Sequence, residues 1–489
     1  MTTRPQPTGG LLYRPEDSVA ADFIPFYWNG AYHLFYLRDW RNPGVHGEGT
    51  PWWHLVTRDF VTFEDWGEAL PRGTRDEQDL YVFTGSVYES DGLFHIFYTG
   101  HNPYFRALGR PEQAVLHATS PDLRVWTKDP AFCFTSPTVQ GYEPHDWRDP
   151  FVYWDPRRRE HAMLLAARKN TGPSRNRGLT AFATSPDLRD WTVQEPFWAP
   201  DEYFTHECPD LFRIGPWWYL VYSTFTERSV THYRMARSLE GPWLAPANDT
   251  FDGRAYYAAK TAGPAMIDGD EPGAPRFVFG WLPTRSDEKD DGGWQWGGEL
   301  VVHQLEQQAD GTLAVRPPDT VLQPFSQTLP LDPQAVLGSW TSEPGILRAD
   351  AVGRQSLLRL AELPTTALVR MRIAYEPETV AVGLLLRASP DFDGYYQLRL
   401  EPAMQRLVVD RWPRPGDQPF MLERPLAMHP GRPVELTVLV DGTNLVAYAD
   451  NQVALSCRMY EHRQGALGAF VTEGMATFSG TSLLARAPR

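Results

Sequence analysis

A short apolar strand recurs five times before residue 282, each time after another apolar run and a tight turn. The five copies are Tyr32–Leu37, Phe94–Thr99, Ala162–Ala167, Trp218–Ser223 and Arg276–Trp281. Two such runs joined by a turn, as at Trp28-Asn29-Gly30, predict a β-hairpin. A period of some tens of residues is typical of solenoids and propellers, so this repeat constrains the fold more strongly than composition does.

A second signature follows the first four strands at intervals of roughly 50 to 65 residues. Its copies begin at Thr57, Thr119, Thr184 and Ala236, and two of them read Thr-Ser-Pro-Asp-Leu-Arg. Units of this length, built from hairpins without helical periodicity, predict four-stranded sheets arranged radially, because radial repetition protects sheet edges. We therefore predict an all-β fold that begins with a five-bladed β-propeller, in which the first strand of each blade lines the central axis.

The chain of 489 residues is longer than one core usually supports, so we expect two domains. Three later strands alternate between apolar and polar residues, as half-buried strands of an antiparallel sandwich do: Leu368–Ile373, Tyr396–Leu400 and Val434–Leu439. The predicted organisation is a catalytic propeller over residues 1–316, a Pro-rich linker over 317–337 and a C-terminal β-sandwich over 338–489.

The net charge and the aromatic content limit the classes of molecule that this protein is expected to bind. The net charge of −15 argues against nucleic acid or an anionic membrane, because both require a basic face. The 18 Trp residues favour sugar recognition, since flat apolar faces stack on sugar rings. We therefore expect a small oligosaccharide as the partner, and the sequence does not predict the oligomeric state.

The cysteines and the first residues bear on chemistry and location. Cys133, Cys208 and Cys457 have no paired spacing, so neither a disulfide framework nor a zinc site is predicted, and we expect no metal and no cofactor. The N-terminal residues lack an apolar signal core, and no run of about 18 apolar residues occurs. The expected location is cytoplasmic.

Three acids precede the repeated strands at matching distances. Asp22, Asp149 and Glu207 lie 11 or 12 positions before the apolar strand of their unit, so we expect them to share one position of the repeat and to converge at the axis. Each also has an ordinary interpretation: Glu207 as a carboxylate at a strand entry, Asp149 as an ion-pair partner of Arg148, and Asp22 as a solvated loop acid. The recurrence favours a common site over independent placement.

Clustered carboxyls suit glycoside hydrolysis, which uses one carboxyl to protonate the leaving oxygen and another to attack the anomeric carbon or activate water. The apolar neighbours of Glu207, among them Trp218, favour a raised pKa and the acid role. Asp149 lies beside the fixed charge of Arg148, so we expect it to stay ionised and to hold sugar hydroxyls. Asp22 is then left as the nucleophile.

Five segments resemble family 32 of the glycoside hydrolases, the invertase, levanase and inulinase group. Trp147-Arg148-Asp149-Pro150 is similar to the family's Arg-Asp-Pro motif, and Glu207-Cys208-Pro209-Asp210 to its Glu-Cys motif. Three further segments resemble family motifs in the right order: Trp53–Asp59, Phe83–Ser86 and Asp252–Ala258. The likeness extends into the C-terminal third.

This resemblance implies a five-bladed propeller plus a β-sandwich and retaining hydrolysis of terminal β-fructofuranosides. It implies that Asp22 is the nucleophile, Asp149 the transition-state stabiliser and Glu207 the acid/base. The expected sugar contacts lie in segments beside the acids and are Trp53, Phe83, Ser86, Arg148, Tyr257 and Trp281. For the aromatic residues among them, a place in the core of a blade is the alternative.

The first family motif is altered here, where Ala21 replaces the Asn before the nucleophile and the Pro-Asn-Gly turn is lost. A hydrogen bond near the sugar is then missing or supplied elsewhere, so arabinofuranosides and other furanosides stay open as substrates. Three other functions stay open: an inverting arabinofuranosidase or xylosidase-like glycosidase, a glycoside phosphorylase, and a non-catalytic carbohydrate-binding propeller. The support for a phosphorylase is weak, because Arg148 and Lys260 are the only candidates for its phosphate site. The linkage, exo or endo action, and hydrolysis versus transfer are not predicted.

Overall fold

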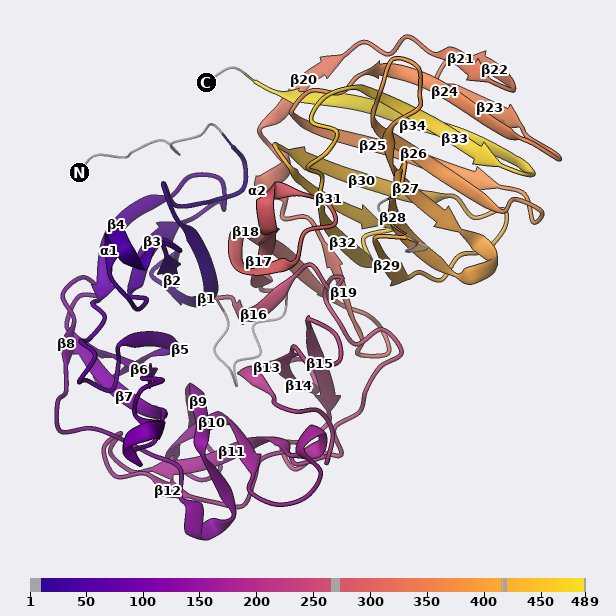
Figure 1. The fold of residues 1–489 in the computed structure, drawn as a ribbon. Coiled ribbons are helices and arrows are strands. Elements are labelled where there is room, and N and C mark those ends of the chain that lie inside the picture. The colour runs from indigo at the N-terminus through magenta and orange to yellow at the C-terminus, as the bar shows by residue number, and fades with distance from the viewer. Residues whose placement is uncertain (1–9, 265–272, 415, 417–419, 488–489) are drawn as a thin grey trace.

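The protein is nearly all β, as predicted. Its structure, a computed structural model, describes residues 10–264, 273–414, 416 and 420–487. The N-terminal sheets are arranged in a ring, and the C-terminal sheets pack beside it (Figure 1). All five strands predicted from the repeat lie within observed strands of the ring. In the part of the chain that the structure describes, no helix is long and apolar enough to cross a membrane.

The ring is built from antiparallel meanders that follow one another in chain order. The first two hold β1 (Val19–Trp28), β2 (Ala31–Asp39), β3 (Trp52–Thr57), β4 (Glu64–Leu70), β5 (Tyr81–Ser90), β6 (Leu93–His101), β7 (Gln113–Ser120) and β8 (Thr127–Lys128). The next two hold β9 (Tyr142–Asp155), β10 (Glu160–Lys169), β11 (Gly178–Ser185), β12 (Thr192–Val193), β13 (Glu207–Ile214), β14 (Trp217–Thr224) and β15 (Val230–Ala236). The last holds β16 (Tyr257–Ala262), β17 (Arg276–Arg285), β18 (Trp294–Gln307) and β19 (Leu313–Arg316). A short helix, α1 (Pro43–His46), lies between β2 and β3.

The ring closes between its first and last meanders. Ala20 of β1 pairs with Gly298 of β18, which joins both meanders into one eight-stranded sheet. A Cβ on Gly298 would lie 1.8 Å from the carbonyl oxygen of Leu282, so only glycine fits at this junction. The two ends of the ring are therefore held together by backbone pairing as well as by side-chain packing.

Two antiparallel sheets form the C-terminal part, and the three strands predicted there lie in β25, β27 and β30. One sheet holds β20 (Phe325–Leu329), β22 (Ser339–Glu343), β23 (Ile346–Asp350), β25 (Thr366–Tyr375), β30 (Val434–Asp441), β31 (Asn444–Ala449), β32 (Val453–Arg458) and β34 (Met475–Arg486). The other holds β21 (Gln334–Leu337), β24 (Gln355–Glu362), β26 (Ala381–Ala388), β27 (Tyr395–Glu401), β28 (Arg406–Trp412), β29 (Leu422–Pro425) and β33 (Ala466–Thr472).

Residues 317–337 differ from the predicted linker. They hold the helix α2 (Asp319–Leu322), β20 and β21, and β20 pairs with β34 while β21 pairs with β24. The prolines that favoured a linker, such as Pro324 and Pro330, lie between these elements and not inside the strands. The stretch therefore joins the C-terminal sheets.

Buried polar contacts fix the C-terminal sheets to the ring. Arg458 of β32 is fully buried, donates to the carbonyl of Leu282 at 2.6 Å and pairs with Glu299. Asp252, from the ring, accepts hydrogen bonds from the backbone N–H (2.8 Å) and hydroxyl (2.6 Å) of Ser456. Removal of one partner of a buried ion pair leaves an uncompensated charge, which is strongly destabilising. These contacts therefore favour one arrangement of the C-terminal sheets against the ring. The segment around Asp252 that resembles a family motif thus contributes to the junction.

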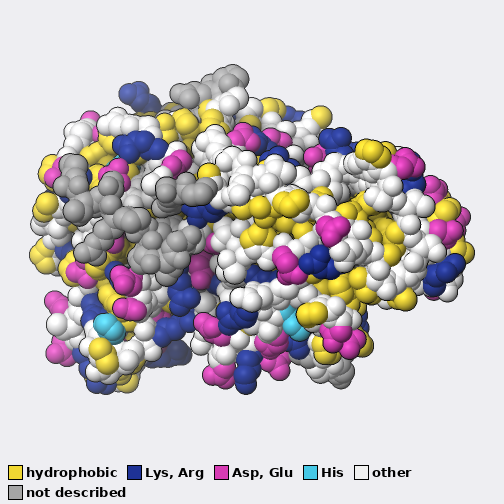
Figure 2. All heavy atoms as spheres, turned by 90° about the horizontal axis from the view of Figure 1, so that it is seen from above, with side chains coloured by type: hydrophobic (Ala, Val, Ile, Leu, Met, Phe, Trp, Pro, Cys, Tyr) yellow, Lys and Arg dark blue, Asp and Glu magenta, His cyan; other side chains and the backbone are white. Residues whose placement is uncertain are grey.

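Charged side chains of both signs are interspersed on the molecular face shown in Figure 2. The described part of this face carries no continuous basic patch.

Candidate active site

The same β-bulge interrupts the inner strand of every meander in the ring. The pairing register shifts after Ala21 in β1, Phe83 in β5, Arg148 in β9, Glu207 in β13 and Tyr257 in β16. A bulge sets extra residues opposite the partner strand and re-aims the side chains beside it. These bulges turn residues toward the ring's axis at one level.

Four of the bulges contain a residue in the left-handed backbone region. The φ angles are 45° at Asp22, 56° at Asp149, 52° at Cys208 and 50° at Ala258. This conformation is uncommon outside glycine and costs about 1 to 3 kcal/mol at each residue, so the surrounding sheet must hold it in place. Such strain is concentrated where a protein positions functional groups.

The bulges correct the predicted equivalence of the three acids. Asp22 and Asp149 occupy the same bulge position, which Cys208 fills in β13. Glu207 is one residue earlier, level with Ala21 and Arg148. The prediction of one shared position is therefore wrong by one residue for Glu207, because turn lengths differ between hairpins and counting along the chain does not resolve such a shift.

The bulges nevertheless bring all three carboxyls into one cavity of about 390 Å³, here called the carboxyl pocket. Every inner strand contributes to it. Its lining consists of Asp22, Phe83, Gln113, Asp146, Arg148, Asp149, Phe204, Glu207, Cys208, Phe225, Tyr257, Ala258 and Trp296.

Arg148 is buried among the acids and binds two of them. Its Nη2 lies 3.0 Å from Oε1 of Glu207, and its Nε lies 3.7 Å from Oδ2 of Asp149. Its remaining N–H groups bond to Asp146 and Thr205. The three neighbouring carboxylates raise the pKa of Arg148 despite its burial, so it stays charged and offsets part of their mutual repulsion.

Two side chains orient the carboxyl of Asp22. Thr84 donates to its Oδ2 at 2.7 Å, and the Trp281 indole N–H donates to its Oδ1 at 3.0 Å. Burial raises the pKa of Asp22 to about 7, while the Thr84 hydrogen bond opposes this shift and the charge of Asp149 adds to it. Asp22 therefore titrates near neutral pH, with each oxygen held by one donor.

Burial also raises the pKa of Glu207, against the opposing effect of Arg148. Its Oε2 accepts a hydrogen bond of 2.5 Å from the Tyr257 hydroxyl. Asp149 accepts the backbone N–H of Cys208 at 2.9 Å in addition to its contact with Arg148. The pocket thus holds three different carboxyls. Glu207 has a raised pKa and lies between two donors, Asp22 titrates near pH 7, and Asp149 lies beside the fixed positive charge of Arg148.

The predicted sugar contacts divide into two groups. Phe83, Arg148 and Tyr257 line the carboxyl pocket, and Trp281 contacts Asp22 from beside it. Ser86 is buried and accepts the backbone N–H of Val152 at 3.0 Å, so it holds neighbouring inner strands together. Trp53 lies outside the lining, where it donates to Asp65 at 2.7 Å and packs under Arg38.

Sequence reasoning did not identify several residues that line the pocket or contact its acids. Thr84 follows Phe83 at the β5 bulge and could have been found from the resemblance of that segment. Trp296 belongs to the aromatic run Trp294-Gln295-Trp296, which is visible in the sequence but has no spacing that predicts a site. Phe225 and Gln113 carry no local signal, because only the closed ring brings their segments to the axis.

The chain is similar in sequence to known proteins over part of its length. A family model described as "Glycosyl hydrolases family 32 N-terminal domain" matches residues 23–317. A levanbiose-producing levanase of Geobacillus stearothermophilus is 29% identical over 252 residues, which cover 48% of this chain and about half (55%) of that relative.

Two solved structures share the fold at a TM-score of 0.73. The sucrose-6-phosphate hydrolase from Lactobacillus gasseri is 17% identical, with 99% of this chain and 94% of that chain covered. The exo-inulinase from Aspergillus awamori is 18% identical, with 100% and 99% covered. The family match alone spans more than half of the chain, and it establishes that this protein belongs to family 32 of the glycosyl hydrolases.

Proposed function

We propose that this protein is a retaining glycoside hydrolase that releases terminal β-fructofuranosyl residues from short oligosaccharides. The observation that carries the proposal is the set of bulges that brings Asp22, Asp149 and Glu207 into one pocket around Arg148. The names of the similar proteins, a levanase, an inulinase and a sucrose-6-phosphate hydrolase, support a fructoside as the substrate. We further propose that the five meanders are the blades of a five-bladed propeller, which residues 1–316 complete.

In the proposed first step, the ionised carboxylate of Asp22 attacks the anomeric carbon of the sugar. The bond from that carbon to the leaving oxygen breaks, and Glu207 gives its proton to the oxygen. In the second step Glu207 takes a proton from water, the water oxygen bonds to the anomeric carbon, and the bond to Asp22 breaks. Two displacements at one carbon retain its configuration.

Asp149 and Arg148 have supporting roles. Asp149 is proposed to hold sugar hydroxyls as positive charge develops on the ring, since its carboxylate is fixed by the Cys208 N–H and Arg148. Arg148 keeps the anionic pocket together. Its guanidinium is already bound to protein acceptors, which speaks against a phosphate site and hence against a phosphorylase.

Glu207→Ala is expected to separate substrates by their leaving group. Loss of the proton donor should lower kcat/KM for a natural disaccharide by about 10³-fold, and much less for a nitrophenyl furanoside, whose leaving group needs no proton. Added azide should restore part of the turnover and give a furanosyl azide. Steady-state kinetics with both substrates provides the test, with the exposed Glu240→Ala as control; an equal loss on both substrates would contradict the acid role.

The pH dependence of kcat/KM should report the two carboxyls. Asp22 must be ionised, so the rate should rise with pH through an apparent pKa near 7, and it should fall again as Glu207 loses its proton. Thr84→Val removes a hydrogen bond that favours ionised Asp22, so the rising limb should move to higher pH. pH–rate profiles of both proteins test this, and a limb that stays in place or moves to lower pH would contradict the assignment.

The cytoplasmic location and the preference for short, imported oligosaccharides stay predictions. So does the identity of the furanoside, since Ala21 removes a side chain that the family motif carries. Release of free sugar from a panel of natural and aryl furanosides would test the substrate directly.

A further inference from the structure

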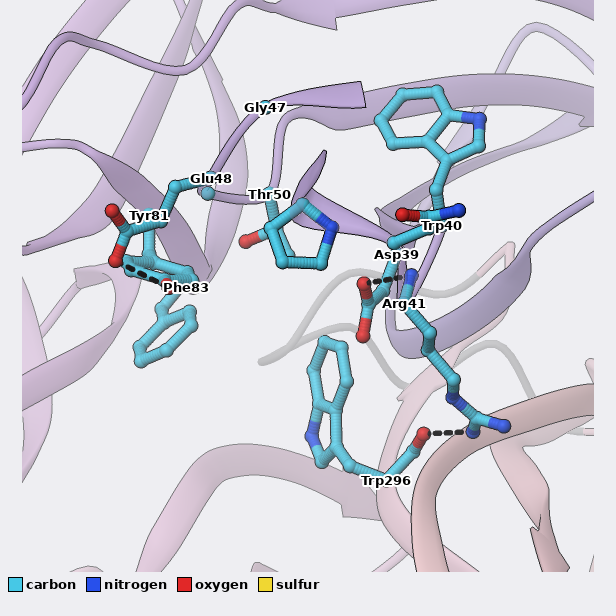
Figure 3. Close-up of a pocket in the computed structure, with 12 residues that line it drawn as sticks. Asp39, Trp40, Arg41, Gly47, Glu48, Thr50, Tyr81, Phe83 and Trp296 are labelled. Carbon is cyan, nitrogen blue, oxygen red and sulfur yellow. Dashed lines mark hydrogen bonds between the residues drawn. The ribbon is translucent and has the colours of Figure 1, made fainter. Parts of the chain in front are cut away.

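A second cavity of about 400 Å³ meets the carboxyl pocket at Phe83 and Trp296, which line both. It is called the outer cavity here, and Figure 3 shows its walls. It is lined by Asp39, Trp40, Arg41, Asn42, Pro43, Gly47, Glu48, Gly49, Thr50, Tyr81, Phe83 and Trp296. A sugar whose anomeric carbon lies at the three carboxyls has its leaving group directed out of that pocket, and the outer cavity is the space beside it.

The walls of the outer cavity suit a sugar ring. Trp40, Tyr81, Phe83 and Trp296 offer aromatic surface, and their positions around one space are visible in Figure 3. Its volume falls within the range of about 300 to 1,000 Å³ typical of small-molecule sites. The carboxylates of Asp39 and Glu48 supply the acceptors that sugar hydroxyls require.

Both carboxylates are fixed in place. Oδ1 of Asp39 accepts the backbone N–H of Arg41 at 2.7 Å. Oε1 of Glu48 accepts the hydroxyls of Tyr104 at 2.8 Å and Tyr81 at 3.2 Å. Each therefore keeps one oxygen free of these bonds while its negative charge stays at the cavity wall.

The positive charges near these acids are already engaged. Arg41 donates to Thr284 at 2.7 Å, to Gln295 at 2.9 Å and to the carbonyls of Trp296 and Gly297. These bonds clamp the loop after β2 to β17 and β18, and the bond from Arg41 to the carbonyl of Trp296 is drawn in Figure 3. They hold in place Trp296, which lines both cavities. Among the described residues that line the two cavities, six are acidic and the two basic ones are Arg41 and Arg148, both bound to protein acceptors.

We propose that the outer cavity binds an uncharged sugar as the leaving group and excludes one that carries phosphate. The inference rests on the proposed function, since it assigns the leaving side of the same reaction. A phosphate dianion binds where Arg or Lys offers free donors, and it would instead face Asp39 and Glu48 in a confined space. Like charges placed together at a binding surface strongly disfavour the wrong ligand.

The test compares sucrose with sucrose-6-phosphate, whose phosphate lies on the glucosyl leaving unit. We expect kcat/KM for the phosphorylated sugar to be at least about 100-fold lower at 10 mM salt, and the ratio should shrink at 150 mM, where the Debye length falls from about 30 to 8 Å. Asp39→Asn and Glu48→Gln keep shape and hydrogen-bond acceptors but remove the charge, so each should narrow the ratio several-fold. Glu240→Gln, on the outer surface, should leave the ratio unchanged.

Calorimetric binding of both sugars to Glu207→Gln gives the same comparison without turnover. Equal or better use of the phosphorylated sugar by an enzyme that hydrolyses aryl fructofuranosides would overturn this inference and leave the proposed function intact. An unchanged ratio in both Asp39→Asn and Glu48→Gln would also overturn it. Inability to hydrolyse any furanoside would contradict the proposed function, while preferential binding of unphosphorylated sucrose would still support the charge selection.

Discussion

Asp22→Asn is expected to lower kcat/KM by at least about 10⁴-fold on every furanoside, whatever its leaving group. The amide cannot form the covalent intermediate, and a better leaving group does not replace an absent nucleophile. Asn keeps the size of Asp and can still receive the Trp281 hydrogen bond while Thr84 turns to accept from it. The measurement is kcat/KM on a disaccharide and on a nitrophenyl furanoside, with exposed Asp201→Asn as the matched control.

The same substitution should stabilise the fold at neutral pH. The pKa of Asp22 rises from its ordinary value near 4 to about 7 in the folded protein, so folding favours the protonated form. The free energy of unfolding therefore falls as pH rises from about 4 to 7, by about 1.4 kcal/mol per pKa unit at most. Because part of the carboxyl faces the pocket, we expect a gain of about 2 kcal/mol for Asp22→Asn at pH 7.5. Near-normal catalytic activity of Asp22→Asn, in contrast, would contradict the assignment of Asp22 as the nucleophile.

Two buried histidine pairs predict loss of the fold in mild acid. In the first meander Nδ1 of His33 lies 3.1 Å from Nε2 of His54, and in the second Nδ1 of His95 lies 3.0 Å from Nε2 of His117. Burial lowers the pKa of His33, His95 and His117 to about 4 and that of His54 well below its ordinary value. Each pair is held by a hydrogen bond that needs one neutral ring as acceptor.

Charged neighbours modify this environment without reversing it. Arg58 and Arg124 lower the pKa of His33 further, while Glu64 raises it. Asp129, 4.0 Å from His117, acts in the raising direction on that ring. Burial is the largest effect in each case.

The unfolded chain binds protons at these four rings below about pH 6.5. In the folded chain His33, His95 and His117 do so only near pH 4, and the pKa of His54 also lies well below its ordinary value. Stability should therefore fall with acidification in this window, by about 1.4 kcal/mol per pH unit for each ring and about 5 kcal/mol per unit for four. Since whole domains are stable by about 5 to 15 kcal/mol, we expect cooperative unfolding between roughly pH 4 and 5. Urea titrations followed by tryptophan fluorescence at several pH values measure the slope.

His54→Gln combined with His117→Gln provides the comparison for this prediction. Glutamine keeps a donor and an acceptor but does not titrate. The number of protons taken up on unfolding, which sets the slope of the unfolding free energy against pH, should therefore fall by about two, even if the variant is less stable at pH 7. Replacement of the less buried His46 or His145 should leave the slope unchanged. A free energy of unfolding that stays flat between pH 6.5 and 4.5 would rule out this role of the pairs.

Much of the fold could be predicted from periodicity. The strands of the ring and of the C-terminal sheets carry their apolar patterns locally. Aspartates in the repeated turns accept the backbone N–H groups of the residues two and three positions later, as Asp122 and Asp187 do. Residues 317–337 were harder to predict, because their strands form only through pairing with β24 and with β34, which lies near the end of the chain. Proline content alone did not reveal those partners.

The sequence predicted the acids of the site and three further lining residues, Phe83, Arg148 and Tyr257, but not the geometry that aims them. Asp149 and Glu207 belong to local motifs, but the bulges that aim them depend on pairing with β10 and β14, so the one-residue offset of Glu207 was invisible in the sequence. Thr84, Trp296 and the histidine pairs act through contacts between strands or blades. The contact of Thr84 with Asp22 and the place of Trp296 follow from ring closure, which no single segment encodes, whereas the histidine pairs depend on the pairing of β2 with β3 and of β6 with β7.

Asp22 and Glu207 are proposed to hydrolyse a fructofuranoside through two displacements. Methanolysis tests this mechanism most directly, because a methyl furanoside keeps its anomeric configuration after release. With an aryl β-fructofuranoside and added methanol, we predict methyl β-fructofuranoside as the first product observed by NMR. Formation of the α-anomer would contradict the retaining mechanism and show that water or methanol, and not Asp22, attacks the sugar first.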